Sequence, residues 1–204
     1  AKAVSKELSF VYVDTGAMYR AMALLCIREK IDGGNEDKVV SACESADVKI
    51  TYKDGAQVVM LNGEDVNGFI RTQEVGDMAS TISVHKGVRE KLVKLQQELG
   101  EKENVVMDGR DIASCVLPNA DLKIYLDADV NVRAKRRYDE LIAKGQPANL
   151  EKITEEVKER DYRDMHRDNS PLVRVPEAIL VDSSYMTIDE VKNAIIAEFE
   201  KVRK

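Results

Sequence analysis

Arginine and aspartate residues that follow short apolar runs carry the most distinctive chemistry in this sequence of 204 residues. One run leads into Asp14-Thr-Gly-Ala-Met-Tyr-Arg20, and another leads into Asp108-Gly-Arg-Asp111. Guanidinium groups bind phosphate through paired N–H donors, and an acidic residue at the end of a strand can hold Mg²⁺ through water molecules. These segments therefore indicate a site for a phosphate group and a divalent cation.

A third group of charges lies between residues 133 and 167. Acidic residues are interleaved with its basic residues. The basic residues are Arg133, Lys135, Arg136, Arg137, Arg160, Arg163 and Arg167. Composition alone leaves two interpretations open: a pair of solvated helices with i,i+4 ion pairs, or a basic surface that binds a small anion.

The charge balance argues against a protein that coats nucleic acid. The chain has 31 basic and 37 acidic residues and a net charge of -6, whereas binding to a phosphate backbone normally requires a basic surface. No apolar run approaches the roughly 20 residues that span a bilayer, and the N-terminus lacks the pattern of a signal peptide. We therefore expect a soluble, cytoplasmic protein that binds neither nucleic acid nor membranes.

The cysteines and histidines give no indication of metal or redox chemistry. Cys26, Cys43 and Cys115 are odd in number and contain no CxxC pair, while His85 and His166 lie far apart without ligand spacing. We expect three reduced, packed cysteines and no catalytic or metal-bound histidine.

The elements that must position the charged residues follow from the apolar pattern. Four apolar runs that end in aspartate predict parallel strands buried on both faces, at residues 10–14, 105–108, 122–127 and 178–182. Helical periodicity predicts helices at 15–30, 88–99, 131–144 and 187–202, the last with Thr187 as its cap. We also expect Asp127 and Asp182 to cap helices. Strands that alternate with helices indicate an α/β fold, in which ligands bind beyond the carboxyl ends of the strands.

Residues from about 46 to 70 break this rhythm. Polar and apolar residues alternate there, and the segment contains Asp54-Gly55 and Asn62-Gly63, which favour tight hairpin turns. The segment therefore predicts a small antiparallel insert of about three strands.

The ordered set of motifs resembles the bacterial cytidylate kinases, which are P-loop nucleoside monophosphate kinases. The resemblance covers essentially the whole chain. Its motifs are Asp14-Thr-Gly-Ala-Met-Tyr-Arg20, Ile70-Arg-Thr-Gln-Glu-Val75, Asp108-Gly-Arg-Asp111, Arg136-Arg137, and Glu159-Arg-Asp-Tyr-Arg-Asp164 followed by Arg167 and Pro171-Leu172. One such motif would be weak evidence, but five in this order are specific.

The resemblance implies a P-loop kinase fold with three layers, α/β/α, around a parallel sheet. Its core would comprise residues 1–45, 71–132 and 168–204, with the insert at 46–70 on the acceptor side and a mobile lid at 133–167. The implied reaction transfers the γ-phosphoryl group of ATP to CMP or dCMP with Mg²⁺ present. The implied oligomeric state is a monomer.

The same resemblance assigns roles to individual side chains around the acceptor nucleotide. Its phosphate would be bound by Arg20, Arg110 and Arg167, in a pocket lined by Thr15 and Tyr19. Its cytosine would contact Ser80, Arg89 and Asp111, and its ribose would contact Arg160 and Asp164.

For the donor, the resemblance places Arg133 against adenine, while Arg137 and Arg163 would close over the triphosphate. Asp108, together with Asp14, would organise Mg²⁺ through water. Catalysis would then depend on five charged groups, namely Arg110, Arg137, Arg163, Arg167 and Asp108. For Arg71, Arg136 and Asp161, an ion-pair role and a ligand contact both stay open.

One family feature is expected before residue 1. The GxxxxGK[ST] phosphate loop has no counterpart in the sequence, and residues 1–8 resemble the helix that follows that loop. Two alternatives to cytidylate kinase activity therefore stay open: a P-loop kinase with another small acceptor, or a non-catalytic nucleotide-binding protein if the chain truly starts at Ala1.

Overall fold

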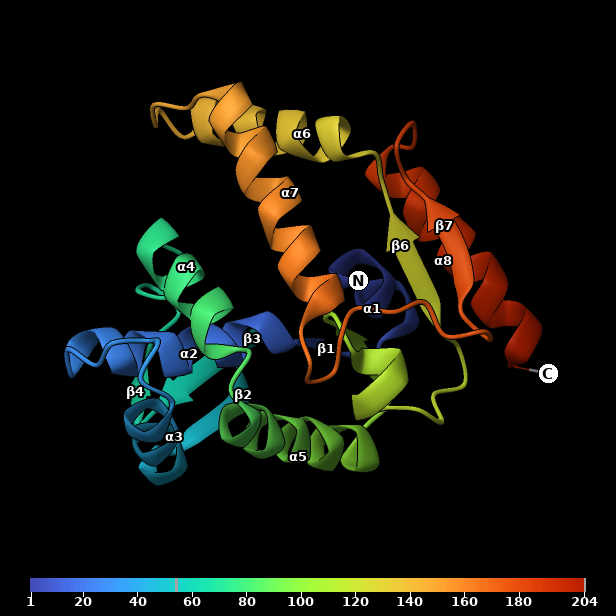
Figure 1. Ribbon diagram of the computed structural model, residues 1–204. Helices are drawn as coiled ribbons and strands as arrows, with labels where there is room; N and C mark the ends of the chain where they lie inside the picture. Colours follow the sequence, from blue (N-terminus) through green and yellow to red (C-terminus); the bar gives the residue numbers. More distant parts are fainter. Residues whose placement is uncertain (54, 204) are drawn as a thin grey trace. The chain divides into compact units, whose positions relative to one another are not determined.

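The computed structural model describes residues 1–53 and 55–203, and the described chain divides into two compact units at residues 117 and 118. Both units mix helices and strands (Figure 1). The first contains α1 (Lys2–Leu8), β1 (Val11–Asp14), α2 (Thr15–Arg28), α3 (Glu36–Ser45), β2 (Val48–Lys53), β3 (Ala56–Leu61), β4 (Glu64–Asp65), α4 (Gln73–Ile82), α5 (Lys86–Lys102), β5 (Val105–Asp108) and the π-helix η1 (Ile112–Val116). The second contains β6 (Ile124–Asp127), α6 (Val130–Ala143), α7 (Leu150–His166), β7 (Ile179–Asp182) and α8 (Ile188–Val202).

A parallel pair of strands, β1 and β5, positions the first two motifs. Val11 is in register with Val105, and Asp14 is in register with Asp108. Both strands therefore end at the same edge in an aspartate, as their apolar runs predicted.

The antiparallel insert predicted at about 46–70 is present as the sheet β2-β3-β4. Asn62 and Gly63 join β3 to β4 with φ angles of 50° and 86°. Two consecutive positive φ angles are what a type I′ hairpin turn requires, which explains the Asn-Gly pair. In the other predicted turn, Asp54 lies outside the described residues.

The core of the first unit is built around α2. Met18 and Met22 on this helix are almost fully buried, and α2 packs against α4 and β3. Val59 and Leu61 of the small sheet belong to the same apolar cluster. The insert therefore shares the core of its unit. Figure 1 shows β3 close to α2.

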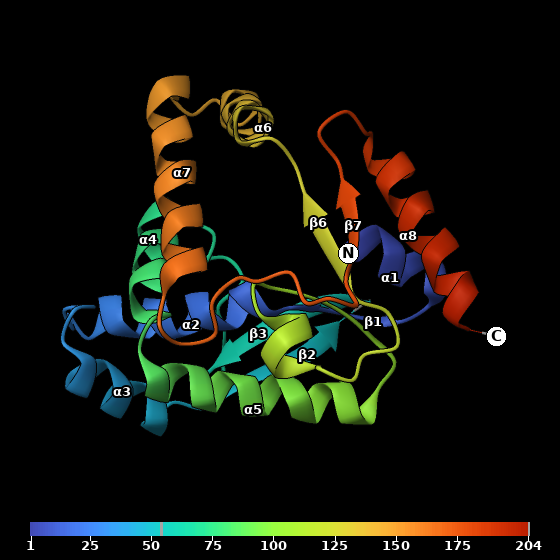
Figure 2. The ribbon, with the colours of Figure 1, turned by 45° about the vertical axis from the view of Figure 1, so that its right-hand side comes forward.

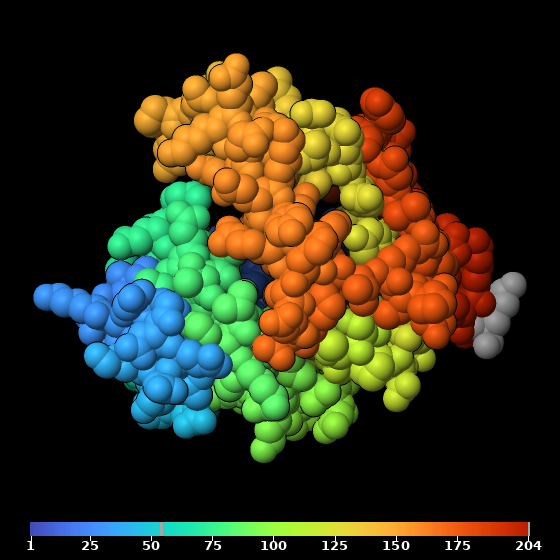
Figure 3. Space-filling view, viewed as in Figure 1, coloured from blue at the N-terminus to red at the C-terminus, as the bar shows by residue number. Residues whose placement is uncertain are grey.

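In the second unit, the parallel strands β6 and β7 pair with each other, and α6 lies beside α7 (Figure 2). The expectation that these strands are buried on both faces is wrong, because Leu126 and Leu180 are 52% and 47% exposed. Each strand of a two-stranded sheet is an edge strand, so fewer neighbours cover its side chains. The surface of α6 and α7 appears in gold and orange in Figure 3.

Helix caps in the second unit differ partly from expectation. The N-cap of α6 is Asp129, and the N-cap of α8 is Thr187, which forms a reciprocal capping box with Glu190. The predicted cap Thr187 is thus confirmed, but the capping roles predicted for Asp127 and Asp182 are wrong. These two carboxylates instead accept hydrogen bonds from the backbone of Ala128 and Ser184, in the turns that follow their strands.

The mixed α/β class with parallel strands is confirmed, while the division into core, insert and lid stays a prediction. No helix in the described part of the chain combines the length and the apolar character needed to cross a membrane.

Candidate active site

Asp14 lies at the junction between β1 and α2, and each of its four polar groups forms a hydrogen bond. Its Oδ1 accepts a hydrogen bond from the N–H of Ala17 (3.0 Å) and so caps α2, while its Oδ2 accepts one from Arg71 (2.6 Å). The side-chain amide of Gln57 binds both the N–H and the C=O of Asp14, at 2.8 and 3.3 Å. Thr15 extends this arrangement, because its hydroxyl donates to the carbonyl of Asp108 (2.7 Å).

Two carboxyl groups therefore share the edge where β1 and β5 end. Removal of water around Asp108 raises the pKa of its carboxyl, and the negative charge of Asp14 raises that pKa further. The phenol of Tyr12 forms a hydrogen bond with Asp108 that acts in the opposite direction. Such an acidic edge favours a nearby cation.

For a metal ion, Asp108 fits better than Asp14. Both carboxylate oxygens of Asp14 already bind other groups, the N–H of Ala17 and the guanidinium of Arg71. Arg71 thus forms an ion pair, while its contact with a ligand stays a prediction. Residues 1–53 and 55–203 hold no group of three or more His, Cys, Asp and Glu side chains with the arrangement of a metal site.

The structure brings together three predicted acceptor residues from separate elements. Arg89 on α5 forms an ion pair with Asp111, and both side chains are buried. The guanidinium of Arg89 also lies 5.6 Å from the ring centroid of Tyr19 on α2. These charged and aromatic groups form a polar wall in which Arg89 and Asp111 are buried and Tyr19 is partly buried.

Ser80 is joined to this wall through Ser83. The hydroxyl of Ser83 donates to the carbonyl of Ser80 (2.9 Å), and the carbonyl of Ser83 accepts a hydrogen bond from Arg89 (3.1 Å). The Nε atom of Arg89 is buried with no hydrogen-bond partner among the described residues. Buried donors are rarely left unpaired, so this N–H is available to a ligand or a water molecule.

Arg20 is held by the segment that carries the Ile70-Arg-Thr motif. Its Nη1 donates to the carbonyls of Ile70 (3.0 Å) and Thr72 (3.3 Å). A Cβ atom at Gly76 would lie 3.0 Å from Nη2 of Arg20, so the absence of a side chain there leaves room for the guanidinium. Arg110 is exposed and directly precedes the buried Asp111.

The second unit organises the other charged residues on α6 and α7. Arg133 forms two parallel bonds to Asp161, at 3.0 and 2.7 Å, and its Nε donates to the carbonyl of Ala128 (2.8 Å). The carboxylate of Asp161 raises the pKa of Arg133. Arg136 donates to the carbonyl of Ser183 (2.6 Å). Asp161 is thus part of an ion pair, whereas Arg136 binds backbone.

Residues predicted for the ribose and the triphosphate lie on the same two helices or just beyond them. Asp164 is buried, with Arg160 at 3.9 Å and Arg167 at 3.8 Å from its carboxylate. Arg137 is paired with Glu140 (3.1 Å), and Arg163 is exposed on α7. Their contacts with nucleotides stay predictions.

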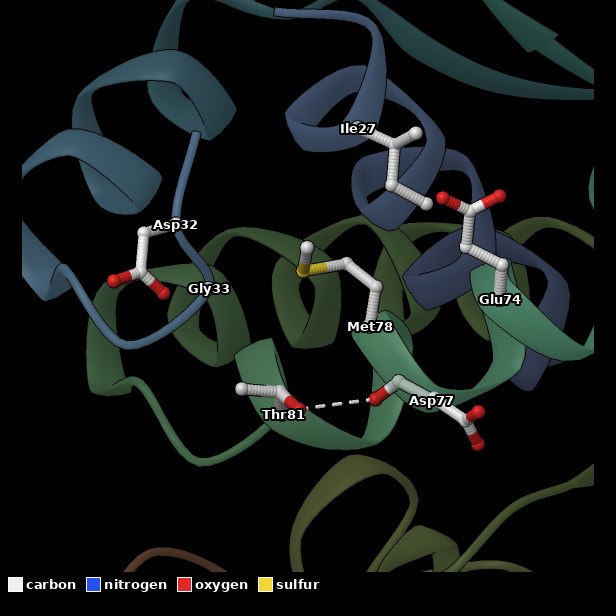
Figure 4. A pocket seen from close by; sticks show the side chains of 7 residues that line it. All are labelled: Ile27, Asp32, Gly33, Glu74, Asp77, Met78 and Thr81. Atoms are coloured by element: carbon white, nitrogen blue, oxygen red, sulfur yellow. Dashed lines mark hydrogen bonds between the residues drawn. The ribbon is translucent and has the colours of Figure 1, made fainter. Parts of the chain in front are cut away.

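A pocket of about 580 Å³ between α2 and α4 is distinct from the predicted site (Figure 4). Three carboxylate residues give it an acidic lining, which disfavours an anionic nucleotide. None of its lining residues was predicted as a site residue. They are Ile27, Asp32, Gly33, Glu74, Asp77, Met78 and Thr81.

Two residues of the insert that contact β1 were not predicted. Gln57 binds Asp14, and the hydroxyl of Tyr52 donates to the carbonyl of Tyr12 (3.0 Å). A signal for Gln57 exists in the sequence, because it shares a strand face with Val59 and Leu61, which are buried. A polar residue on an apolar face indicates a specific partner.

The comparisons with known proteins agree over nearly the whole length. A family model described as "Cytidylate kinase" matches residues 1–201. A cytidylate kinase of Bacillus subtilis (strain 168) is 45% identical over 202 residues, covering 98% of this chain and 90% of that protein. One of Caldicellulosiruptor bescii is 44% identical over 203 residues, with coverages of 100% and 90%. One of Bacillus cereus (strain B4264) is 42% identical over 197 residues, with coverages of 97% and 88%.

Proposed function

The chain belongs to the cytidylate kinase family, and we propose that it transfers the γ-phosphoryl group of ATP to CMP or dCMP, giving ADP and CDP or dCDP. The observation that best supports this acceptor is the buried ion pair of Arg89 and Asp111 beside Tyr19. Cytosine offers an exocyclic amine that a carboxylate can accept from, whereas uracil offers only a carbonyl at that position.

On the acceptor side, Arg20 and Arg110 bind the phosphate that attacks ATP, with Arg167 as a third cation. The carbonyls of Ile70 and Thr72 hold Arg20 before any ligand arrives, so little side-chain entropy is lost when phosphate binds. Thr15 and Tyr19 line the phosphate pocket, and Ser80 contributes to binding of the base.

Arg160 and Asp164 bind the ribose of the acceptor, while Arg133 lies against the adenine of ATP. Arg137 and Arg163 neutralise charge on the triphosphate. Phosphoryl transfer needs positioning and charge stabilisation more than a nucleophilic side chain, and arginines supply both.

The divalent ion that accompanies ATP would be held by Asp108 through water, because the Asp14 carboxylate is engaged by Arg71 and Ala17. Mg²⁺ supplies charge neutralisation on the phosphate oxygens when it is bound. We also propose that the enzyme acts as a monomer in the cytoplasm, and light scattering of purified protein tests its oligomeric state.

A coupled assay of ADP formation with CMP, dCMP, UMP and AMP tests the activity. We expect CMP and dCMP to be the preferred acceptors. Arg20→Ala and Arg110→Ala should each lower kcat/KM for CMP by about 30-fold or more, because loss of a charge-assisted contact typically costs about 2–5 kcal/mol.

Arg28→Ala is the matched control, since Arg28 pairs with Glu64 on the surface of the same unit. Its kcat/KM should stay within about twofold of the unaltered protein, as expected for an exposed ion pair. Equal rates with all four acceptors, or wild-type kinetics in both site variants, would contradict the proposed acceptor site.

A further inference from the structure

The two edges of β1 have different partners. The N–H of Val11 donates to the carbonyl of Asn104 (2.8 Å), which places Val11 and Val13 on the edge paired with β5. Because successive residues of a strand direct their backbone groups to opposite edges, Tyr12 and Asp14 present theirs at the other edge. The backbone N–H and C=O groups at this second edge therefore need a hydrogen-bond partner other than β5.

Side chains of the small antiparallel sheet supply that partner. A carboxamide has one acceptor oxygen and an N–H donor, as a peptide group has. The Gln57 amide accepts from the N–H of Asp14 (2.8 Å) and donates to its carbonyl (3.3 Å). The hydroxyl of Tyr52 donates to the carbonyl of Tyr12 (3.0 Å), which lies two residues before Asp14 on the same edge of β1. Gln57 thus occupies the place that a residue of a neighbouring strand would fill.

Gln57 is itself held in place. The side chain of Asn67 accepts from the N–H of Val59 (3.3 Å) and donates to the carbonyl of Gln57 (3.1 Å). The backbone that carries Gln57 is therefore fixed on both sides, by Asn67 and by strand β2. A side chain on a fixed backbone positions its partner more accurately than one on a mobile loop.

We infer that Gln57 is a positioning residue of the acceptor site. It holds Asp14, the last residue of β1 and the cap of α2, and thereby sets the start of the helix that carries Thr15, Tyr19 and Arg20. The small sheet then contributes to acceptor binding through this backbone pairing. The inference rests on the proposed cytidylate kinase function.

Gln57→Met tests the inference, since methionine has similar length but cannot form either hydrogen bond. In the ligand-free variant, exchange of the Asp14 amide hydrogen should be about 10-fold faster, because its protecting bond is lost. KM and the calorimetric Kd for CMP should rise about 5- to 10-fold, while KM for ATP changes less than about twofold, because misplacement acts on the acceptor alone. Gln57→Glu keeps an acceptor for the Asp14 amide and should retain part of the protection.

Gln97→Met is the matched control, since Gln97 on α5 bonds to a backbone carbonyl, that of Cys115, away from β1. It should lower Tm without changing CMP affinity. If Gln57→Met behaves like this control, or if exchange at Asp14 is unchanged, the inference is overturned. An unaltered protein that fails to phosphorylate CMP would instead overturn the proposed function, and the exchange measurement would still report on the pairing.

Discussion

Asp111 and Arg89 form an ion pair in which the two side chains are only 7% and 4% exposed. Removing one partner of such a pair leaves an uncompensated buried charge, which typically costs about 3–5 kcal/mol. Each group is therefore tolerated in the interior because the other is present. This mutual dependence means that a change at Asp111 can alter base recognition, the orientation of Arg89, or both.

The first prediction separates these two effects with Asp111→Asn. If Asp111 contacts the base, its carboxylate accepts from the amine of cytosine and repels the carbonyl of uracil. The preference for CMP over UMP in kcat/KM should then shrink by about 1–3 kcal/mol. Steady-state kinetics with both acceptors measure the preference.

A uniform loss on CMP and UMP, with the preference intact, would show that Asp111 only orients Arg89. Circular dichroism and urea unfolding of the variant serve as the control for folding, since loss of the buried charge lowers the free energy of unfolding.

The second prediction concerns Asp108 and pH. Its pKa is raised in the folded protein, so between the ordinary value and the raised value the folded state binds more protons than the unfolded state. The free energy of unfolding therefore falls as pH rises through this window. Asp108→Asn removes that loss of stability. The unfolding free energy of the variant, measured against that of the unaltered protein, should therefore be more favourable at pH 7 than at pH 3. Its kinase activity should fall.

Asp182→Asn is the control of opposite sign. Hydrogen bonds from Ser184 lower the pKa of Asp182, so its carboxylate stabilises the fold above that pKa and loses the effect as pH falls. Urea unfolding at several pH values measures both variants. Identical pH profiles for the two would contradict the environment assigned to Asp108.

Sequence patterns predicted strands, helix caps and turns well where residues close in sequence determine them. The apolar run at 105–108 coincides with β5, and the expected cap Thr187 begins α8, where it forms a capping box with Glu190. The Asn62-Gly63 pair makes the expected hairpin, because few other residue pairs adopt two positive φ angles. In each case, the residues that determine the structure are neighbours in sequence.

Contacts between distant residues could not be predicted in this way. The bond between Gln57 and Asp14 joins residues 43 positions apart. Side-chain to backbone bonds of this kind depend on tertiary packing, which local periodicity does not encode.

The third prediction tests the close approach of the two strand ends. A Cβ atom at Gly109 would lie 2.6 Å from Oγ1 of Thr15 and 2.8 Å from Cδ1 of Ile112. In Gly109→Ala, the Thr15 hydroxyl, the Ile112 side chain or the backbone must therefore shift. We expect about 1–3 kcal/mol lower unfolding free energy together with weaker CMP binding.

Gly68→Ala provides the comparison, because a Cβ atom at Gly68 has no heavy atom within 4 Å. Denaturant unfolding and CMP titration should leave this variant close to the unaltered protein. Equal effects at the two glycines would show that the contact with Thr15 is unimportant.

The last prediction asks how Arg133 meets ATP. Its two terminal nitrogens bind Asp161, and its Nε binds the carbonyl of Ala128, so the edge of the guanidinium is occupied while the pair fixes its plane. A guanidinium held in this way can still stack on adenine through its face. Asp161→Ala should then raise KM for ATP by about 3- to 10-fold with little change in kcat, since an unfixed side chain loses more entropy on binding. Asp139→Ala, which removes an exposed pair with Lys135 on α6, should leave KM unchanged. A lower KM for ATP in Asp161→Ala would mean that Asp161 competes with a phosphate group for the edge of Arg133.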